Sequence, residues 1–345
     1  MAKGFYIGAN NVAHKGKKAY VGINNVARKV KKIYTGVNGV AKLAWNSEYT
    51  TAVSSSGTLP EGYKFYNSGT DVAVPYNGNS NILEIFTGIL PENNKSYLYN
   101  IAENTLTETS KQASVDLWAY DGCASADGYM YFLSISNSKV YKMRQSDYAL
   151  IGNASISLST SYYLAEKCII EFGDSIYFPI YYSTSDDKYR VYLYALNKST
   201  LALTRADNSA LTLSDTRNMG MVVHGGSLYV FYNSDDEGKY LYCYKFDPSD
   251  GGWDSAFYTN TSPFGSGFNV LRAMELDGET YLFAGSHYQM ATKIYKVNYS
   301  AKTYTLFATL SEGVRVETWL HNGNGTVIST YDSASSANFT KLEFK

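Results

Sequence analysis

The chain has 345 residues, a formal net charge of −1, and 34 tyrosines against six prolines. Its length exceeds what a single sandwich core usually holds and favours one large repeat-built domain or two domains. The first residues contain no apolar signal segment, and no stretch approaches the roughly 18 apolar residues of a membrane span. We therefore expect folding in a reducing cytosol, without a membrane span.

The charge is distributed unevenly along the chain. Residues 1–45 hold nine basic residues and no Asp or Glu, so the remainder holds 21 basic and 31 acidic residues, a net charge of −10. A basic segment of this kind usually meets an acidic partner, either nucleic acid or an acidic protein surface. The alternative interpretation is that the lysines only keep an exposed apolar repeat soluble.

Residues 6–47 consist of three near-copies of one 14-residue unit. The copies YIGANNVAHKGKKA (6–19), YVGINNVARKVKKI (20–33) and YTGVNGVAKLAWNS (34–47) repeat Tyr, Gly, Val and Ala in the same register. An Asn-Asn or Asn-Gly turn between two apolar stretches predicts a small β-hairpin in each copy. A unit this short cannot bury a core, so the copies must stack on each other or on another protein.

The unit resembles the N-terminal repeats, of the form Tyr-x-Gly-Val-Asn-Gly-Val-Ala-Arg-Lys-Val-Lys-Lys, that open many structural proteins of phages and prophages of Gram-positive bacteria. The resemblance covers about 45 residues, and the first copy departs from it at His14 and Gly16. It implies that residues 1–46 dock on other virion proteins in front of a variable C-terminal domain. The docking residues would be Tyr6, Tyr20, Tyr34, Val12, Val26, Val40, Arg28, Lys29, Lys31 and Lys32.

A linker and a longer repeat follow the basic arm. Residues 47–61 are rich in Ser and Thr and end in Leu-Pro, which is typical of a linker. From residue 62 to residue 345, a glycine turn between two strand-like segments recurs every 45 to 53 residues, and a third and a weaker fourth segment follow each time. The turn glycines are Gly78, Gly128, Gly173, Gly226, Gly278 and Gly323.

Four strands at this period are the pattern of a β-propeller blade. The sequence therefore predicts an all-β fold, a six-bladed β-propeller over residues 62–345. The sixth unit has only three strands, and we expect residues 62–68 to supply its outer strand and close the ring. The competing interpretation is a pair of β-sandwich domains.

The sequence contains no recognised catalytic motif. The three cysteines lie far apart, without a zinc-type spacing, so we expect buried free thiols, no metal site and no cofactor. Aligning the first strands of the units places a set of polar and aromatic residues at the channel entrance, where propellers usually bind ligands. This set could bind a ligand, or its charges could pair around the axis: Asp71, Trp118, Glu166, Arg217, Arg272, Glu317 and Trp319.

These patterns lead to one main hypothesis and several alternatives. The main hypothesis is a non-enzymatic virion protein, present in multiple copies and associated with the tail or baseplate. Its arm would dock on the particle, and its propeller would bind a host-surface glycan or protein or a neighbouring virion protein. One alternative is a virion-borne glycan-degrading enzyme that uses propeller carboxylates, and another is a capsid decoration protein. Nucleic-acid binding through the arm ranks last, because the body is acidic and no nucleic-acid module is recognised.

Overall fold

The structure of this chain is a computed structural model. It describes residues 5–9, 12–16, 19–23, 26–30, 32–37, 40–46, 49, 51–58, 72–76, 79–86, 95–100, 103, 105–112, 115, 119–134, 137–157, 162–164, 168–183, 189–213, 219–233, 241–259, 270–285, 292–310, 319–321, 326–330 and 338–344. The chain divides into two compact units, Met1–Thr51 with Lys345, and Ala52–Phe344. In these ranges the ordered elements are β-strands, so the all-β prediction is confirmed.

The first unit contains three two-stranded antiparallel hairpins, one for each copy of the repeat. Residues 10–11, 24–25 and 38–39 separate the strands, so each hairpin has a two-residue loop. Backbone pairs such as Ala9 with Val12 close the loops. The strands are β1 (Phe5–Ala9), β2 (Val12–Gly16), β3 (Ala19–Ile23), β4 (Val26–Val30), β5 (Lys32–Val37) and β6 (Val40–Asn46).

The described strands of the second unit form six antiparallel sheets. Sheet one is β8 (Val72–Tyr76), β9 (Asn79–Phe86), β10 (Lys95–Asn100) and β11 (Thr105–Gln112). Sheet two is β12 (Ala119–Ala124), β13 (Tyr129–Ser134), β14 (Lys139–Arg144) and β15 (Leu150–Ser155). Sheet four is β22 (Met219–His224), β23 (Ser227–Asn233), β24 (Leu241–Asp247) and β25 (Gly252–Thr259). Sheet five is β26 (Val270–Leu276), β27 (Glu279–Gly285), β28 (Lys293–Asn298) and β29 (Thr303–Thr309).

Sheets three and six differ from this simple order. In sheet three, β16 (Tyr162–Leu164) and β17 (Ile170–Phe172) both pair with β18 (Ser175–Ser183), so the first position is split in two. The fourth position is split as well, because β20 (Leu203–Arg205) and β21 (Leu211–Leu213) both pair with β19 (Tyr189–Asn197). Sheet six combines β30 (Trp319–His321), β31 (Thr326–Thr330) and β32 (Asn338–Phe344) with β7 (Ala52–Thr58), which comes from the other end of the unit.

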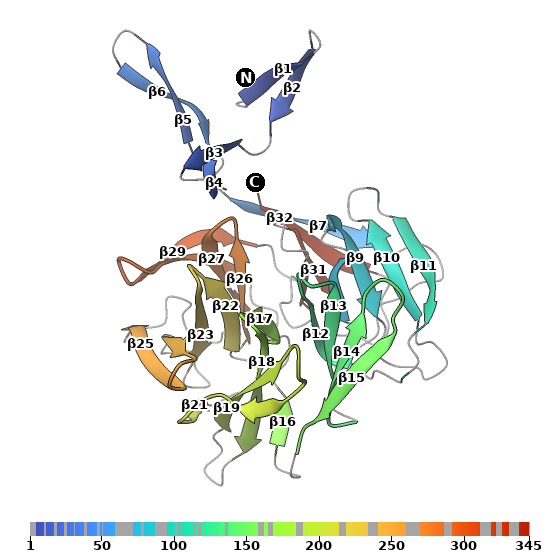
Figure 1. Ribbon diagram of the computed structural model, residues 1–345. Coiled ribbons are helices and arrows are strands. Elements are labelled where there is room, and N and C mark those ends of the chain that lie inside the picture. Colours follow the sequence, from blue (N-terminus) through green and yellow to red (C-terminus); the bar gives the residue numbers. More distant parts are fainter. Residues whose placement is uncertain are drawn as a thin grey trace. The chain divides into compact units, whose positions relative to one another are not determined.

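The sheets are arranged around a common centre, as Figure 1 shows. The first strands of neighbouring sheets contact one another from β8 to β12, β17, β22 and β26, and β30 contacts β8. Backbones approach closely there, because a Cβ on Gly220 of β22 would lie 2.7 Å from the Ala273 backbone nitrogen of β26. This arrangement confirms the predicted β-propeller.

The strand that completes sheet six differs from the prediction. β7 pairs with β32 along its whole length, from Ala52 opposite Phe344 to Thr58 opposite Asn338. Residues 52–58 are therefore a strand of the propeller, so the linker predicted for residues 47–61 is wrong over this range. Residues 62–68, which we expected to fill this place, lie outside the described part of the chain. The first strand of the unit thus pairs with its last strand, β32, and covers an edge of β32 that would otherwise be unpaired.

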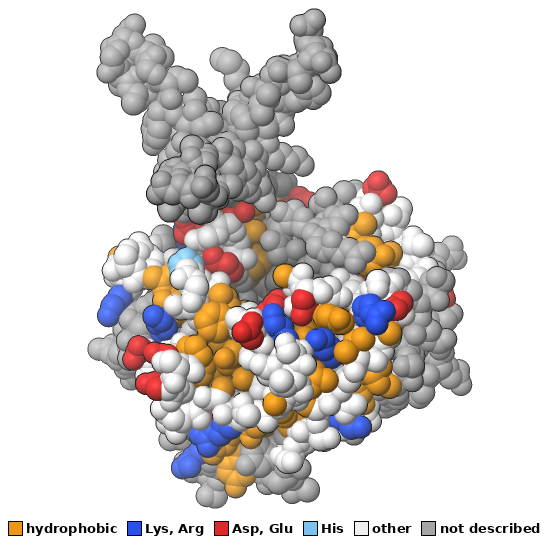
Figure 2. All heavy atoms as spheres, in the orientation of Figure 1, with side chains coloured by type: hydrophobic (Ala, Val, Ile, Leu, Met, Phe, Trp, Pro, Cys, Tyr) orange, Lys and Arg blue, Asp and Glu red, His pale blue; other side chains and the backbone are white. Residues whose placement is uncertain are grey.

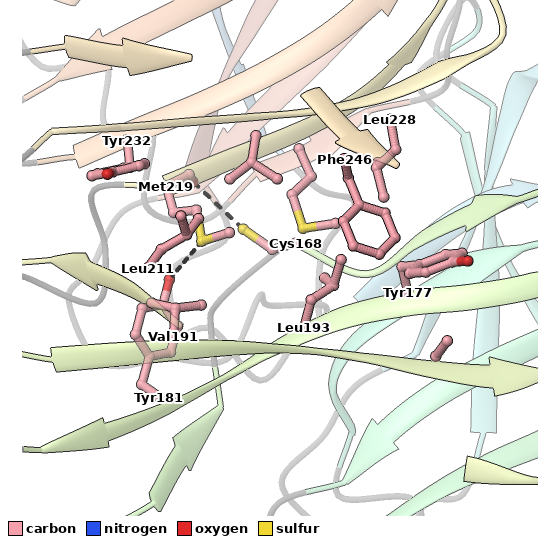
Figure 3. Packing of buried hydrophobic residues seen from close by; sticks show 13 residues of the cluster. Cys168, Tyr177, Tyr181, Val191, Leu193, Leu211, Met219, Leu228, Tyr232 and Phe246 are labelled. Carbon is pink, nitrogen blue, oxygen red and sulfur yellow. Dashed lines mark hydrogen bonds between the residues drawn. The ribbon is translucent and has the colours of Figure 1, made fainter. Parts of the chain in front are cut away.

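The core lies between the faces of neighbouring sheets. Separate clusters of buried side chains fill the spaces between sheets one and two, two and three, three and four, and four and five. Figure 3 shows the cluster between sheets three and four, where Cys168, Leu193 and Phe246 meet. Because both faces of a sheet are covered, its second strand reads as a nearly continuous apolar run, as in YMYFLS of β13. Each large apolar side chain buried in this way contributes about 1.5–3 kcal/mol.

The abundant tyrosines also serve this packing. Tyr242 and Tyr244 of β24 stack on the buried Tyr232 of β23, with ring centroids 5.0 and 5.8 Å away. Both pack against the cluster between sheets three and four. Tyr141 and Tyr295 belong to other clusters of the same kind. Aromatic pairs at these distances add to the burial of apolar surface.

Candidate functional site

The hairpin arm holds the predicted docking residues in a repeated backbone register. Tyr6 lies opposite Lys15 and Tyr20 lies opposite Lys29, at equivalent positions of the first two hairpins. In the third hairpin Leu43 takes the place of the lysine, opposite Tyr34. Val12, Val26 and Val40 each begin the second strand of their hairpin, immediately after the loop.

Five of the nine basic residues of the arm lie within its described strands. Arg28 and Lys29 are part of β4, and Lys32 begins β5. Lys31 lies outside the described residues. Over the described residues the hairpin strands therefore carry positive charge, and no acidic residue within the first 45 residues offsets it.

Of the predicted channel residues, only Arg272 has a described side chain. It lies on β26, is 2% exposed, and donates from Nη1 to the Leu271 carbonyl oxygen at 2.9 Å. Trp319 begins β30, where its backbone pairs with Ser329. The described residues therefore do not test whether this set forms a ligand site. Five of its members lie outside the described residues: Asp71, Trp118, Glu166, Arg217 and Glu317.

Two polar sites of the propeller lie where the first strand of a sheet turns into the second, in sheets three and five. In an antiparallel sheet, the turns after the first and third strands lie at the same edge, which we call the turn end. Gly173 and Gly278 lie in these turns with φ of 58° and 83°, a conformation that favours glycine. The opposite edge, where the second strand connects to the third, is called the loop end.

Glu171 joins sheets two and three at the turn end. Its Oε1 accepts hydrogen bonds from Ser125 Oγ at 2.6 Å and from Lys198 Nζ at 2.5 Å. Its Oε2 accepts from the backbone nitrogen of Ala126 at 3.3 Å. The hydrogen bond to Glu171 is the main reason why the pKa of Lys198 is raised. These donors come from both sheets, so the Glu171 carboxylate holds sheets two and three together.

Glu275 has the equivalent place in sheet five, one residue before the end of the first strand. Nδ1 of His224, from sheet four, lies 3.3 and 3.2 Å from its two carboxylate oxygens. Thr280 Oγ1 donates to Oε2 at 2.8 Å. The His224 ring stacks on Tyr299 with centroids 4.3 Å apart, and burial is the main cause of the raised pKa of that tyrosine. This carboxylate therefore joins sheets four and five.

A third carboxylate is completely buried between sheets one and two. Glu84 of β9 is 0% exposed, and it accepts hydrogen bonds from the Tyr148 hydroxyl and, at 2.9 Å, from Gln145 Nε2. The Tyr148 hydroxyl also bonds to Ser96 Oγ of β10. Burial, followed by the charge of Glu84, raises the pKa of Tyr148. Because buried charges are stable only when hydrogen-bonded, these contacts fix the two sheets in one position.

Asp207 is a further buried carboxylate, in the segment that splits the outer strand of sheet three. Its Oδ1 accepts from the Leu193 backbone nitrogen at 3.1 Å and from Arg205 Nε at 3.0 Å. Among the described residues, Oδ2 has no hydrogen-bond partner. Burial is the largest influence on this carboxyl group and raises its pKa despite the neighbouring arginine.

The cysteines are not placed for nucleophilic chemistry. All three are free, with Cys168 and Cys243 buried and Cys123 partly buried. Burial raises the pKa of the Cys123 thiol, and the nearby Asp121 and Glu171 raise it further. Thiols of this kind stay protonated and unreactive near neutral pH. Within the described residues, no three His, Cys, Asp or Glu side chains are placed to hold a metal ion.

The inter-sheet carboxylates were not predicted, although the sequence contains a signal for two of them. The segments IIEFGDSIYF (169–178) and AMELDGETYLF (273–283) place Glu171 and Glu275 at the same offset from a Gly-Asp or Asp-Gly turn. Comparing the repeats position by position would have selected both. Glu84 lies in the middle of β9 and has no counterpart of this kind.

Comparison with known proteins relates the chain to others by fold alone. No family model matches the sequence, and the curated proteins contain no match. A solved structure of a DUF4221 family member from Bacteroides vulgatus is 9% identical with a TM-score of 0.53, over 86% of this chain and 99% of that one. A structural genomics protein of unknown function from Bacteroides thetaiotaomicron is 14% identical with a TM-score of 0.51, over 99% and 90% of the two chains. A streptogramin B lyase is 11% identical with a TM-score of 0.48, over 86% and 99%.

The part of the chain that the structure describes contains no candidate for a membrane-spanning helix. No helix there is long and apolar enough to cross a bilayer.

Proposed function

We propose that this chain is a structural protein of a phage virion, associated with the tail or baseplate. Its hairpin arm docks on other virion proteins, and its propeller, with each of the six sheets as one blade, binds a host-surface glycan or protein or a neighbouring virion protein. Several copies are present in each particle. The chain acts by binding, without an enzymatic step.

The observation that carries this proposal is the arm. Three hairpins repeat one backbone register, with tyrosine and lysine opposite each other in the first two. An isolated two-stranded hairpin is at best marginally stable in water, so an array of them is suited to a surface that supplies the missing contacts. The nine basic residues favour an acidic surface.

The loop end of the propeller is the better candidate for the binding surface. First-to-second-strand turns in sheets three, four and five have only two residues between the strands. In sheets one, four and five the connection from the second to the third strand is longer, over residues 87–94, 234–240 and 286–292. Binding residues are found mainly on loops of this kind, held by a rigid scaffold.

The face drawn in Figure 2 shows basic and acidic side chains interspersed with apolar ones. On that face no single charge dominates among the coloured residues. In sequence, by contrast, the arm holds nine basic residues and no acidic one, and the remainder of the chain has a net charge of −10, which favours the arm as the electrostatic docking element.

The first test is the protein content of purified particles. We expect peptides from both the arm and the propeller in particles made by a host that carries the gene, at a fixed ratio to the major capsid protein, measured by quantitative mass spectrometry. The ratio would separate a tail or baseplate location from a capsid decoration. Absence from clean particles would overturn the proposal and would direct attention to glycan hydrolysis by the free protein.

A charge-reversal variant tests the role of the arm. We expect Arg28→Glu with Lys29→Glu to lower the number of copies per particle at least about tenfold, because two favourable charges become repulsive. The matched control is Arg190→Glu with Lys302→Glu, which makes the same charge change at exposed positions of the propeller. Equal incorporation of both variants would contradict docking through the arm.

A further inference from the structure

The hairpin arm has unpaired backbone edges at regular positions. Each hairpin is a separate two-stranded sheet, and in the described residues no strand of one hairpin pairs with a strand of another. Each therefore has two free edges, and unpaired strand edges readily accept a further strand. The register of each hairpin determines which backbone groups point toward these edges.

Hydrogen-bonded and non-hydrogen-bonded pairs alternate along an antiparallel hairpin. In a hairpin with a two-residue loop, the pair next to the loop is hydrogen-bonded, here Ala9 with Val12. The next pair, Gly8 with Ala13, is then non-hydrogen-bonded, and so is Tyr6 with Lys15. The N–H and C=O groups of these residues point away from the partner strand, toward the free edges.

The outward-directed positions largely coincide with the repeated residues of the sequence. The same alternation makes Gly22 with Ala27 and Gly36 with Ala41 non-hydrogen-bonded pairs. Tyr, Gly and Ala, three of the five residue types repeated in all copies, thus mark the backbone groups that are free to bond outside the hairpin. The repeat therefore presents one pattern of donors and acceptors three times.

We propose that the arm docks by β-strand addition, pairing its free edges with exposed strand edges of an acidic virion protein. This inference rests on the proposed function and specifies how the arm binds. An exposed edge offers alternating N–H donors and C=O acceptors, and another strand satisfies both. Phosphate groups of a nucleic acid only accept hydrogen bonds, so they would leave the carbonyl groups unpaired.

The charges of the arm select an acidic partner over a second copy of the arm. Residues 1–45 contain nine basic and no acidic residues, so pairing two arms would bring like charges together on adjacent strands. Lys15 and Lys29 lie at the outward-directed positions themselves. An acidic strand edge turns the same contact into favourable pairs.

The test removes three of the outward donors of the full-length chain, one in each hairpin, without changing its charge. Ala13→Pro, Ala27→Pro and Ala41→Pro together delete three outward N–H groups, and proline is tolerated at strand edges where the N–H is not used inside the sheet. We expect the number of copies per particle to fall at least about tenfold. The control with valine at the same three positions keeps the donors and is expected to incorporate like the wild type.

A second measurement does not depend on the folding of the proline variant. In the wild type, amide hydrogen exchange at residues 5–46 is expected to be at least about tenfold slower in particles than in the free protein. Fast exchange in both states, or normal incorporation of the triple proline variant, would overturn strand addition. Release of the wild type by nuclease treatment, or pairing of free copies through their arms, would overturn the acidic protein as partner.

The possible results keep this inference and the proposed function apart. If Arg28→Glu with Lys29→Glu abolishes incorporation and the proline variant incorporates normally, the arm docks by charge alone. This result would contradict strand addition and leave the proposed function intact. If the wild type is absent from particles, the proposed function itself falls.

Discussion

Residues in the left-handed backbone region mark a recurring turn between the third and fourth strands. In sheets two, three and four the last turn residue donates its N–H to the carbonyl four residues earlier, at 2.9 Å. This last residue has φ of 59° at Tyr148, 58° at Leu201, 73° at Gly251 and, in sheet five, 54° at Lys302. Only one of the four is glycine, so three turns contain a residue in a conformation that costs an L-amino acid about 1–2 kcal/mol.

Replacing Lys302 by glycine should therefore stabilise the protein. Lys302 is exposed, so little packing is lost, and we expect the free energy of unfolding to rise by about 0.5–1 kcal/mol after the entropic cost of glycine. Urea denaturation measures the change. The reverse substitution, Gly251→Ala, should lower stability by at least about 1 kcal/mol, since its Cβ would lie 2.5 Å from the Ala206 carbonyl oxygen. A destabilised Lys302→Gly would contradict this account.

The buried carboxyl of Asp207 predicts a dependence on pH. A carboxyl group whose pKa is higher in the folded than in the unfolded chain binds protons more tightly when folded. Its contribution to stability is therefore lost as the pH rises from the unfolded pKa through the folded one. Asp207→Asn keeps an acceptor for the Leu193 N–H but does not titrate.

We expect the stability of Asp207→Asn relative to the wild type to increase with pH from about 4 upward, and to level off above the folded pKa. Urea denaturation at a series of pH values measures this difference. A difference that stays constant or decreases with pH would show that burial does not raise the pKa of this group.

At the scale of elements, β7 shows where sequence patterns were insufficient. Its sequence AVSSSGT is mostly small and polar, and it alternates irregularly between buried and exposed. This composition is typical of linkers, which is why the range was misassigned. The small residues have a structural reason, because the Phe339 ring packs directly over Gly57. A composition rule cannot reveal a partner strand that lies nearly 300 residues away.

Other elements were predictable because their signals are local. The second strands are apolar on both faces, and tight turns with positive φ at Gly128, Gly173, Gly226 and Gly278 separate them from the first strands. Third strands such as β14 and β24 follow the second strands of their sheets, as the repeat predicted. The channel residues were harder, since aligning strands does not show burial: Arg272 proved to be inside the protein.

A substitution at Gly57 tests the role of β7. A Cβ at this position would lie 2.3 Å from Cε2 of Phe339, so we expect Gly57→Ala to lower the free energy of unfolding by about 1–3 kcal/mol. Ser56→Ala, at an exposed position of the same strand, is the control and should change stability by less than about 0.5 kcal/mol. Thermal or urea unfolding followed by circular dichroism measures both. Equal stability of the two variants would show that this contact does not secure the strand.

At the scale of the whole molecule, the packing predicts that the ring opens as one unit. Sheets two, three and four are each held by clusters on both sides, and Cys168 and Cys243 lie in two different clusters, between sheets three and four and between sheets four and five. Local opening of one space would expose one thiol without the other.

We expect Cys168 and Cys243 to react with a thiol reagent at the same rate, that of global unfolding, and far more slowly than a free cysteine. Mass spectrometry of labelled peptides over time measures the two rates separately. Rates that differ more than about tenfold in native buffer would show that the sheets separate one at a time.

The entry of the chain through β7 also has a mechanical consequence. Only residues 47–51 separate the last hairpin strand from Ala52, so tension on a docked arm passes directly into β7. The hydrogen bonds between β7 and β32 run perpendicular to the strands, and a pull along the strand therefore shears all of them together. A pull across the strand would peel them one by one. An anchored particle in moving fluid would thus be held most strongly when the force runs along β7. The pairing of β7 with β32 therefore determines how much force the molecule withstands.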